Sequence, residues 1–529
     1  MRRILVALIC ALLIANALAS VSASTPAPGG WAPSPIDALP EDRSEWWPDD
    51  APLTGAREAA FDWLDGQQAA DGSWSEDYGV TGLVAFAMLN GGRDSDHPVV
   101  AKALATVLAE AREDGSFSEG TYVHYYTSVA VMALAAGGQD EDEPLVRAGV
   151  DMLVRDQCDG DEENFEEWWR GGIGYGGDGR PDMSNTQFAM MALAAAEAAY
   201  PSVDVPRDTW QQALVFLKRC QNLPEVNDLD WDDEEGDPNF ADGGFVYFPG
   251  RSNAGDLVSY GSMTAAGLWS LLAAGETTDD PAPGAALSWL GENFDVTENP
   301  GYSDSAYYYY AWALARALRT AGAPALEPPS GDILPWAVEL ADEMLSRQSP
   351  DGAWRNEDSS AYWEGDPVVA TCFALLGVEA LMPAEDASLR ISAPDGGKVR
   401  VTDPQGRRNA EIPGWEEDRD GSILLDDASS GPFSVEVEGA DMVELASEVD
   451  GKVRVIREVG LARDGGRMTV DVAPLLGPAS LVITGISALP ASASATAAPG
   501  AGVVMALVAV IVLAAAAAVM VRRGPRKEG

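Results

Sequence analysis

Two kinds of helical pattern alternate between about residues 51 and 385. The first kind is amphipathic, as in 57–67, where apolar residues recur every three or four positions among charged ones. The second kind is apolar all round and rich in alanine, as in 80–89 and 127–136. A helix that is apolar on every side is a buried one, whereas an amphipathic helix keeps one face in water. The pattern therefore predicts inner helices, each preceded by an outer helix.

A glycine-containing turn separates the two helices of each pair, and this unit repeats six times. The sequence shows none of the polar capping repeats that an open solenoid needs at its ends. We therefore expect a mainly α protein in which six helical hairpins close into an (α/α)6 toroid over residues 51–385. The clearest turns are Asp71-Gly72-Ser73-Trp74, Asp114-Gly115-Ser116-Phe117, Gly172-Ile173-Gly174-Tyr175, Asp242-Gly243-Gly244-Phe245 and Asp351-Gly352-Ala353-Trp354, with a weaker one at Gly301-Tyr302.

The pattern changes to strict alternation of apolar and polar residues after about residue 386. Such alternation is typical of strands with one buried face, and turn residues separate the segments. We expect a small β-sandwich over 386–487, followed by an Ala/Ser/Pro linker over 488–500. The alternating segments are 389–391, 398–402, 433–438 and 468–472.

Both ends of the chain have the pattern of targeting segments. Residues 1–23 combine two arginines, an apolar run and a small-x-small site, as in a secretory signal peptide, and 24–50 is a linker. Residues 501–521 are apolar throughout, long enough for a transmembrane helix, and the basic tail 522–529 follows. The positive-inside rule then predicts a single-pass cell-membrane protein, mostly extracytoplasmic, with its tail in the cytoplasm.

Two alternatives at these ends stay open. An uncleaved anchor helix is the alternative to the signal peptide. The segment from Pro499 to the tail also resembles the C-terminal sorting signals that archaeosortase and exosortase enzymes cut, so the C-terminal helix is either retained or removed.

The charge excludes one class of partner. The 529 residues carry 34 Lys and Arg against 84 Asp and Glu, a formal net charge of −50. Nucleic-acid binding depends on Lys and Arg that neutralise phosphates, so no nucleic acid is expected as a partner.

The 16 Trp, 14 Tyr and 12 Phe argue against a disordered chain. After signal removal, Cys158, Cys220 and Cys372 remain, and their spacing predicts buried free thiols.

Two turns carry a family resemblance. Gln68-x3-Gly72-x-Trp74 and Gln348-x3-Gly352-x-Trp354 are similar to the QW repeat of squalene–hopene and other triterpene cyclases. The whole series resembles the prenyltransferase/squalene oxidase repeat proteins of the terpenoid cyclase and protein prenyltransferase toroid superfamily. The resemblance implies an α/α toroid and leaves the activity open, because the superfamily contains cyclases, transferases and non-enzymatic binding domains.

The catalytic motifs of that superfamily are missing or misplaced here. Triterpene cyclases protonate their substrate with a D-x-D-D motif that is usually followed by Thr-Ala. Asp230, Asp232 and Asp233 have this spacing, but Glu234-Glu235 follows within an acidic stretch. A catalytic acid needs burial to keep its proton, whereas this stretch is typical of a solvated loop, so no catalytic residue is assigned.

The sequence also lacks the residues that metal and cofactor chemistry would require. His97 and His124 are the only histidines, and neither stands where the zinc ligand of protein prenyltransferases is expected. The diphosphate-binding DDxxD motif and the thioester motif of complement-type toroids are missing too. We expect no metal and no cofactor.

The starts of the inner helices supply the remaining candidates. Because each inner helix follows its turn, their N-termini should gather at one mouth of the ring. Aromatic, carboxylate and amide side chains there can stack on a glycan or peptide, and a carboxylate pair can do acid–base work. The alternative is that the polar residues cap helices and the tyrosines fill the ring. The candidates are His124, Tyr125, Tyr126, Trp168, Trp169, Asp182, Asn185, Gln187, Tyr260, Tyr307, Trp363, Glu364 and Asp366.

The leading hypothesis is an exported, membrane-anchored toroid protein that binds an extracellular glycan or peptide at its mouth. The alternative is an enzyme, either a terpenoid-cyclase-like isomerase or a glycan hydrolase or lyase with rim carboxylates.

Overall fold

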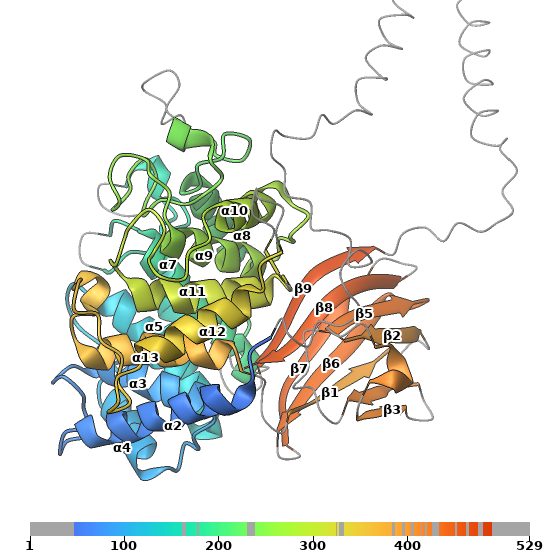
Figure 1. The fold of residues 1–529 in the computed structure, drawn as a ribbon, viewed down its shortest axis with the longest axis horizontal. Helices are drawn as coiled ribbons and strands as arrows, with labels where there is room; N and C mark the ends of the chain where they lie inside the picture. The colour runs from blue at the N-terminus through green and yellow to red at the C-terminus, as the bar shows by residue number, and fades with distance from the viewer. Residues whose placement is uncertain are drawn as a thin grey trace, which may run out of the picture. The chain divides into compact units, whose positions relative to one another are not determined.

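The computed structural model is mainly helical, with two β-sheets in the C-terminal part (Figure 1). It describes residues 47–488 apart from 161–164, 177–178, 201, 230–237, 324, 327–332, 383–386, 394–396, 404–406, 413, 418–420, 426–432, 450–451, 462–464 and 474–479. The expected signal peptide, the C-terminal helix 501–521 and the tail lie outside these residues. Within them, no helix has the length and apolar character needed to cross a membrane.

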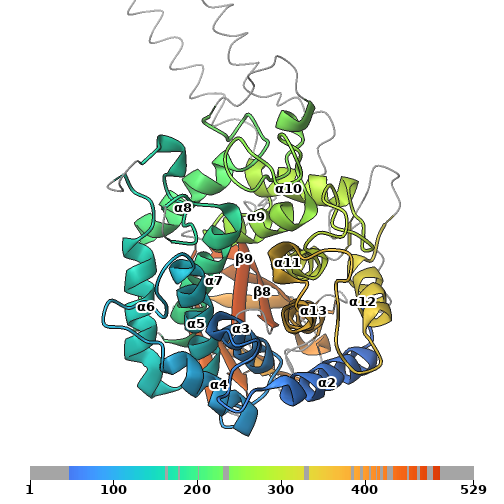
Figure 2. The same cartoon turned by 90° about the vertical axis from the view of Figure 1, so that its left-hand side faces the viewer.

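Twelve α-helices among the described residues form six consecutive hairpins around a ring (Figure 2). The second helix of every hairpin surrounds the centre of the ring, and the first lies at its periphery. The outer helices are α2 (Asp50–Gln67), α4 (Pro98–Leu108), α6 (Glu143–Arg155), α8 (Arg207–Arg219), α10 (Pro281–Glu292) and α12 (Trp336–Arg347). The inner helices are α3 (Tyr78–Asn90), α5 (Val123–Gly137), α7 (Met183–Ala199), α9 (Gly261–Ala273), α11 (Tyr307–Thr320) and α13 (Pro367–Ala380).

The burial of the helices follows the two sequence patterns. In α13 every residue from Val368 to Ala380 is buried, as expected of a helix that is apolar all round. In the outer helix α6 only one stripe is buried, from Val146 to Leu153. The predicted division into inner and outer helices is therefore confirmed.

In five hairpins, a threonine near the start of the inner helix holds the preceding glycine-containing turn in place. The backbone N–H of Trp74 donates to Thr81 Oγ1 over 3.1 Å, and that of Trp354 donates to Thr371 Oγ1 over 3.0 Å. This bond satisfies an N–H that would otherwise be buried without a partner. The same bond joins Phe117 to Thr127, Ile173 to Thr186, and Phe245 to Thr264.

A glutamine at the end of four outer helices ties its own turn to the next outer helix. The Gln68 side-chain amide donates to the backbone carbonyls of Gly72 (3.2 Å) and Val99 (2.9 Å). One NH₂ group thereby satisfies one carbonyl within its hairpin and one in the following hairpin. Gln157 and Gln221 make the equivalent pairs of bonds to Gly171 and Thr209 and to Gly243 and Ala282.

The sixth hairpin closes on the first through the same interaction. The Gln348 amide donates to Gly352 O (2.9 Å) within its turn and to Ala56 O (2.8 Å) in α2. Gly352 has a φ of +94°, and a Cβ added to it would lie 2.2 Å from the carbonyl oxygen of Ala59. Helix α13 also packs against α2 and α3. The chain is therefore a ring and not an open solenoid.

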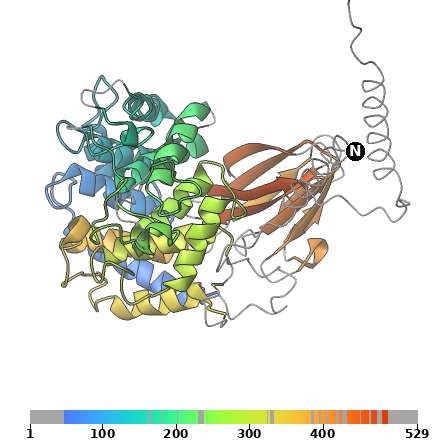
Figure 3. The ribbon, with the colours of Figure 1, turned by 90° about the horizontal axis from the view of Figure 1, so that it is seen from above.

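Nine strands among the described residues form two antiparallel sheets, seen in orange to red in Figure 3. One sheet has the order β3-β4-β1-β6-β7 and the other β2-β5-β8-β9. Alternate residues of β5 are buried, and its Val435 lies opposite Val401 of β2. The strands are β1 (Ala387–Ser392), β2 (Lys398–Thr402), β3 (Trp415–Glu417), β4 (Ile423–Leu425), β5 (Phe433–Glu438), β6 (Met442–Val449), β7 (Lys452–Gly460), β8 (Gly465–Ala473) and β9 (Ser480–Ala488).

Replacing the glutamine at the closure tests how much this bond stabilises the ring. Gln348→Ala leaves two carbonyls without their donor, and we expect the free energy of unfolding to fall by about 1–3 kcal/mol in urea unfolding. The matched control is Gln67→Ala, because the Gln67 amide is exposed and contacts only Trp63 O of its own helix. That variant should stay within about 0.5 kcal/mol of the wild type. Equal stability of the two variants would contradict the role of Gln348.

Candidate functional site

A cavity of about 730 Å³ lies at the N-terminal ends of the inner helices. Ten of its eighteen lining residues have aromatic side chains, and the polar lining includes Arg180, Asp182, Ser184 and Asn253. A large, mostly apolar cavity with a few converging polar groups is the usual form of a ligand site. The aromatic lining residues are Tyr122, Tyr125, Tyr175, Phe188, Tyr247, Tyr302, Tyr309, Tyr362, Trp363 and Phe373.

Aromatic rings of the inner helices pack against one another in the cavity wall. Phe188 of α7 stacks on Tyr309 of α11, with ring centroids 6.3 Å apart and planes 12° apart. Tyr125 of α5 meets Phe188 edge-on at 5.0 Å, and Phe373 of α13 meets Tyr309 at 5.5 Å. Such pairs hold each ring in a defined orientation. Four of the six inner helices thus share one aromatic wall.

A strap of residues 356–366 from the sixth hairpin crosses the mouth. It includes the 3₁₀ turn η6 (Ala361–Trp363). Tyr362 stacks on Tyr309 of the fifth hairpin at 5.3 Å, and Trp363 meets Tyr122 of the second hairpin at 5.5 Å. Both strap residues have positive φ, 54° and 62°, which is unfavourable for bulky side chains and recurs at ligand-binding sites.

Glu364 anchors the strap to the start of α11. Its carboxylate accepts the backbone N–H groups of Tyr308 (3.2 Å) and Tyr309 (2.7 Å) and the Asn356 side-chain amide (2.9 Å). The N-terminus of a helix favours a negative charge. Because Glu364 is 0 % exposed, burial nevertheless raises its pKa to about 7. Glu364 lines a second cavity of about 540 Å³, not the aromatic one.

Asp182 is the only carboxyl among the residues that line the aromatic cavity. It caps α7, where it accepts the Asn185 backbone N–H (2.9 Å) and the Asn185 side-chain amide (2.7 Å). The side chain is 4 % exposed, and burial raises its pKa to about 6 against the hydrogen bonds from Asn185 and Tyr247, which lower it. Burial therefore makes this carboxyl keep its proton to a higher pH than an exposed aspartate does.

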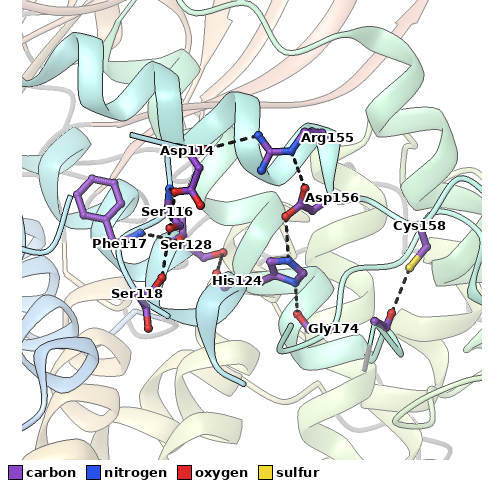
Figure 4. A network of polar contacts seen from close by, with 12 residues as sticks. Asp114, Ser116, Phe117, Ser118, His124, Ser128, Arg155, Asp156, Cys158 and Gly174 are labelled. Carbon is purple, nitrogen blue, oxygen red and sulfur yellow. Dashed lines mark hydrogen bonds and ion pairs between the residues drawn. The ribbon is translucent and has the colours of Figure 1, made fainter. Parts of the chain in front are cut away.

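His124 is held between two acceptors and leaves no ring nitrogen for a ligand. Its Nδ1 lies 3.0 Å from the Gly174 carbonyl, and its Nε2 lies 3.3 Å from Asp156 Oδ2 (Figure 4). Asp156 in turn accepts Arg155 Nε over 2.8 Å. This network joins α5 to α6 and to the next turn, so His124 has a structural role.

The other sequence candidates divide by their distance from the cavity. Tyr125, Asp182 and Trp363 line it. Asn185, Gln187 and Tyr260 stand one layer behind, because they contact Asp182, Tyr309 and Tyr362 respectively. Tyr126 also stands behind the wall and donates its hydroxyl to Asp77 Oδ2 over 2.6 Å.

The remaining candidates serve the scaffold. The Tyr307 hydroxyl donates to Val296 O (2.6 Å), and Asp366 caps α13 and accepts the Ser75 hydroxyl (2.6 Å). Trp168 stacks on Phe248, 5.9 Å away, and Trp169 meets Trp168 edge-on. Asp230, Asp232 and Asp233 lie outside the described residues.

The cavity residues that are not among the sequence candidates include two groups of aromatic residues. Tyr175, Tyr247 and Tyr302 follow turn glycines by one to three positions, and this recurrence is the signal that identifies them. Phe188 and Phe373 belong to apolar inner helices, where no sequence feature separates a wall residue from a core residue.

In the described part of the chain, no group of three or more His, Cys, Asp or Glu side chains is placed to hold a metal ion. Cys158, Cys220 and Cys372 are buried, as predicted, and no two of them form a disulfide.

The comparison with protein families agrees with this architecture. Residues 76–248 match the family model of the squalene-hopene cyclase C-terminal domain. The matched residues lie within the repeat region, and the match agrees with the resemblance to the terpenoid cyclase and protein prenyltransferase toroid superfamily. No curated protein matches the sequence.

Solved structures with a similar chain trace include type II terpene cyclases. The apo type II terpene cyclase MstE from Scytonema is 15% identical, with a TM-score of 0.40, 63% of this chain and 98% of that chain covered. A variant of that cyclase in complex with merosterolic acid A is 14% identical, with a TM-score of 0.41 and coverages of 62% and 96%. A protein from Actinoplanes is 16% identical, with a TM-score of 0.38 and coverages of 62% and 99%.

The start of α7 combines residues that line the cavity with one that holds the turn. Residues 182–186 read Asp-Met-Ser-Asn-Thr. Ser184 and Asp182 line the cavity, and Thr186 holds the turn through Ile173. The segment therefore presents one acid to the cavity.

The raised pKa of Asp182 makes the stability depend on pH with a defined sign. Folding raises this pKa from 3.8 to about 6, so the native state binds the proton more tightly and stability falls as the pH rises through that window. Asp182→Asn removes the titration. The free energy of unfolding of Asp182→Asn, measured relative to that of the wild type, should therefore increase by up to about 3 kcal/mol from pH 4 to pH 7. This value follows from about 1.4 kcal/mol for each pKa unit. Urea unfolding at each pH measures the difference.

The control for this measurement is Asp77→Asn. Asp77 caps α3 in the same manner, with its side chain accepting the Val80 N–H over 2.9 Å, so the control reports the loss of a capping carboxylate. A difference between wild type and Asp182→Asn that does not change with pH would contradict the assignment.

Proposed function

We propose that this is an exported, membrane-anchored toroid protein that binds an extracellular glycan or peptide at the mouth of its ring. The observation that carries the proposal is the aromatic cavity of about 730 Å³ at the N-terminal ends of the inner helices. Flat rings offer apolar faces to sugar rings and to peptide side chains, and the polar residues at their edge orient the ligand.

The exposure of large side chains at the mouth supports binding. Among the described residues, only three large hydrophobic side chains are exposed, and two of them are Tyr122 (39 %) and Trp363 (42 %). These two line the same cavity and meet edge-on. Exposed apolar groups that gather at one concave place mark interaction sites, whereas scattered ones do not.

The carboxylates at the mouth do not favour glycoside hydrolysis. That reaction uses two carboxyl groups facing the scissile bond across a defined gap. Asp182 is the single carboxyl in the cavity lining. Glu364 is bound to the start of α11, and Asp366 caps α13, so neither forms a pair with Asp182.

A cyclase-like isomerase is the second candidate function. Its specific support is a buried acid in an aromatic cavity, since Asp182 with a pKa of about 6 holds a proton under mildly acidic conditions. Aromatic faces also stabilise nearby positive charge, as a protonated polyene would carry. In this reading Asp182 protonates the substrate, and the wall rings face the cation.

Incubation with a ligand panel distinguishes the two functions. The purified full chain in detergent is mixed with oligosaccharides, peptides and polyisoprenoid alcohols, and binding is followed by intrinsic fluorescence and products by mass spectrometry with chromatography. We expect saturable binding of a glycan or peptide without any product. Conversion of a polyisoprenoid to an isomer of equal mass would overturn the binding function in favour of the isomerase.

Trp363→Ala tests whether the ligand uses the aromatic mouth. Loss of one stacking ring should weaken the affinity at least about tenfold, equivalent to about 1.4 kcal/mol. The matched control is Trp210→Ala, because Trp210 lies on the outer helix α8 and is half-buried away from the cavity. Equal affinities of the two variants would place the ligand elsewhere.

The proposed export and anchoring have their own test. In cells of the source organism or of a secretion host, the full chain should fractionate with membranes and be digested by external protease. A chain that ends at residue 500 lacks the apolar segment and should appear in the medium. Retention of the shortened chain in the membrane fraction would contradict the anchor at 501–521.

A further inference from the structure

A buried arginine lies on the third turn of α11, deeper in the ring than the aromatic cavity. Arg316 is 0 % exposed. Its guanidinium carbon stands 4.3 Å from the ring centroid of Trp269 on α9 and 4.6 Å from that of Trp312 on α11. The two indoles provide favourable cation–π contacts.

The hydrogen-bond donors of Arg316 are only partly used. Nη1 contacts the sulfur of Met191 on α7. Nε and Nη2 face no acceptor among the described residues. These two nitrogens form the side-on edge of the guanidinium, which is the edge that binds a carboxylate through two parallel N–H bonds.

A second buried donor is unsatisfied nearer to the mouth. Gln187 stands one helical turn before Met191 on α7, and its oxygen accepts the Tyr309 hydroxyl. Its Nε2 is buried and has no acceptor in the described part of the chain. Buried donors are normally paired, so the inner face of α7 and α11 offers more donors than the chain satisfies.

The charge of Arg316 is also uncompensated. Burial lowers its pKa to about 9, which still leaves the guanidinium protonated at neutral pH. No described Asp or Glu forms an ion pair with it. A buried ion without a counter-charge is strongly unfavourable unless an ion of opposite sign accompanies it.

We propose that Arg316 forms a binding site for a small monovalent anion, a halide or a carboxylate, at its Nε–Nη2 edge. The guanidinium carbon lies over both indole rings, and the Nε–Nη2 edge has no described acceptor, so the anion is assigned to that edge. A chloride ion or the carboxylate of a short acid accepts both N–H groups and supplies the missing charge. The site is independent of the ligand proposed at the mouth.

Anion exchange at constant ionic strength tests the site. Thermal unfolding of the full chain is measured while sodium chloride or sodium formate replaces sodium gluconate, whose anion is too bulky for the site. An anion that binds only the folded state stabilises it, so the Tm should rise by about 2 °C or more and then level off as the site saturates. A larger effect of formate than of chloride assigns a carboxylate site, and the reverse order assigns a halide site.

Two variants make the test specific. Arg316→Met keeps the approximate volume and removes the charge, and it should lose the anion-dependent rise. Arg319→Met is the matched control, because Arg319 is a buried arginine of the same helix that donates to the Ala380 and Met382 carbonyls. It should be less stable at every anion concentration and keep the rise. A wild type without any rise, or an Arg316→Met variant with the full rise, would overturn the site.

Bromide gives a readout on the wild type alone, should Arg316→Met fail to fold. A heavy halide at this edge lies beside Trp269 and Trp312 and quenches their fluorescence. We expect a saturable loss of part of the tryptophan emission, which formate or chloride reverses by competition. Quenching that stays linear in bromide and ignores the competing anion would contradict the proposal. Trp363→Ala should leave the saturable part unchanged, which separates this site from the mouth.

Discussion

The ring depends on one side-chain amide contact that recurs at four of the six junctions between successive hairpins. The glutamine that ends an outer helix donates one N–H to the carbonyl of its own turn and the other to the backbone of the next outer helix. A hairpin buries its inner helix only when neighbours stand on both sides, and the glutamine fixes the angle to one of them. Gln348 makes the bond to Ala56 that Gln68, Gln157 and Gln221 make to the hairpins that follow them, so closure uses the same contact.

The same geometry creates the mouth. Because a threonine holds five of the six turns to the first turns of their inner helices, the starts of these helices are fixed together at one end of the ring. Aromatic residues near those starts then face a common space. The strap adds Tyr362 and Trp363 from above, and Glu364 fixes it at a helix start where backbone N–H groups are free. Rigid helices supply the wall, and an irregular segment with unfavourable φ values supplies the cover.

The sequence predicts the ring well and the site only in part. The contrast between Arg57–Gln67 and Val80–Leu89 is enough to tell an outer helix from an inner one, because burial on one face or on all faces leaves different patterns. The same reasoning cannot tell Phe188 or Phe373 from core residues, since both kinds are apolar. Glu364 and Asp366 have the polarity expected of catalytic residues but bind helix starts, a competition that sequence alone does not resolve. The acidic candidates at Asp230, Asp232 and Asp233 stay predictions.

The cover and wall of the cavity come from different hairpins, and this has a consequence for how such a site can change. A ring of six identical subunits would repeat every substitution six times, so its central cavity would have to stay symmetric. Here all six units belong to one chain. Each hairpin can alter its own contribution without altering the other five, provided that it keeps the contacts that join it to its neighbours. The ring therefore has the architecture of a closed oligomer and the freedom to build an asymmetric site, in which Asp182 is the only carboxyl among the lining residues.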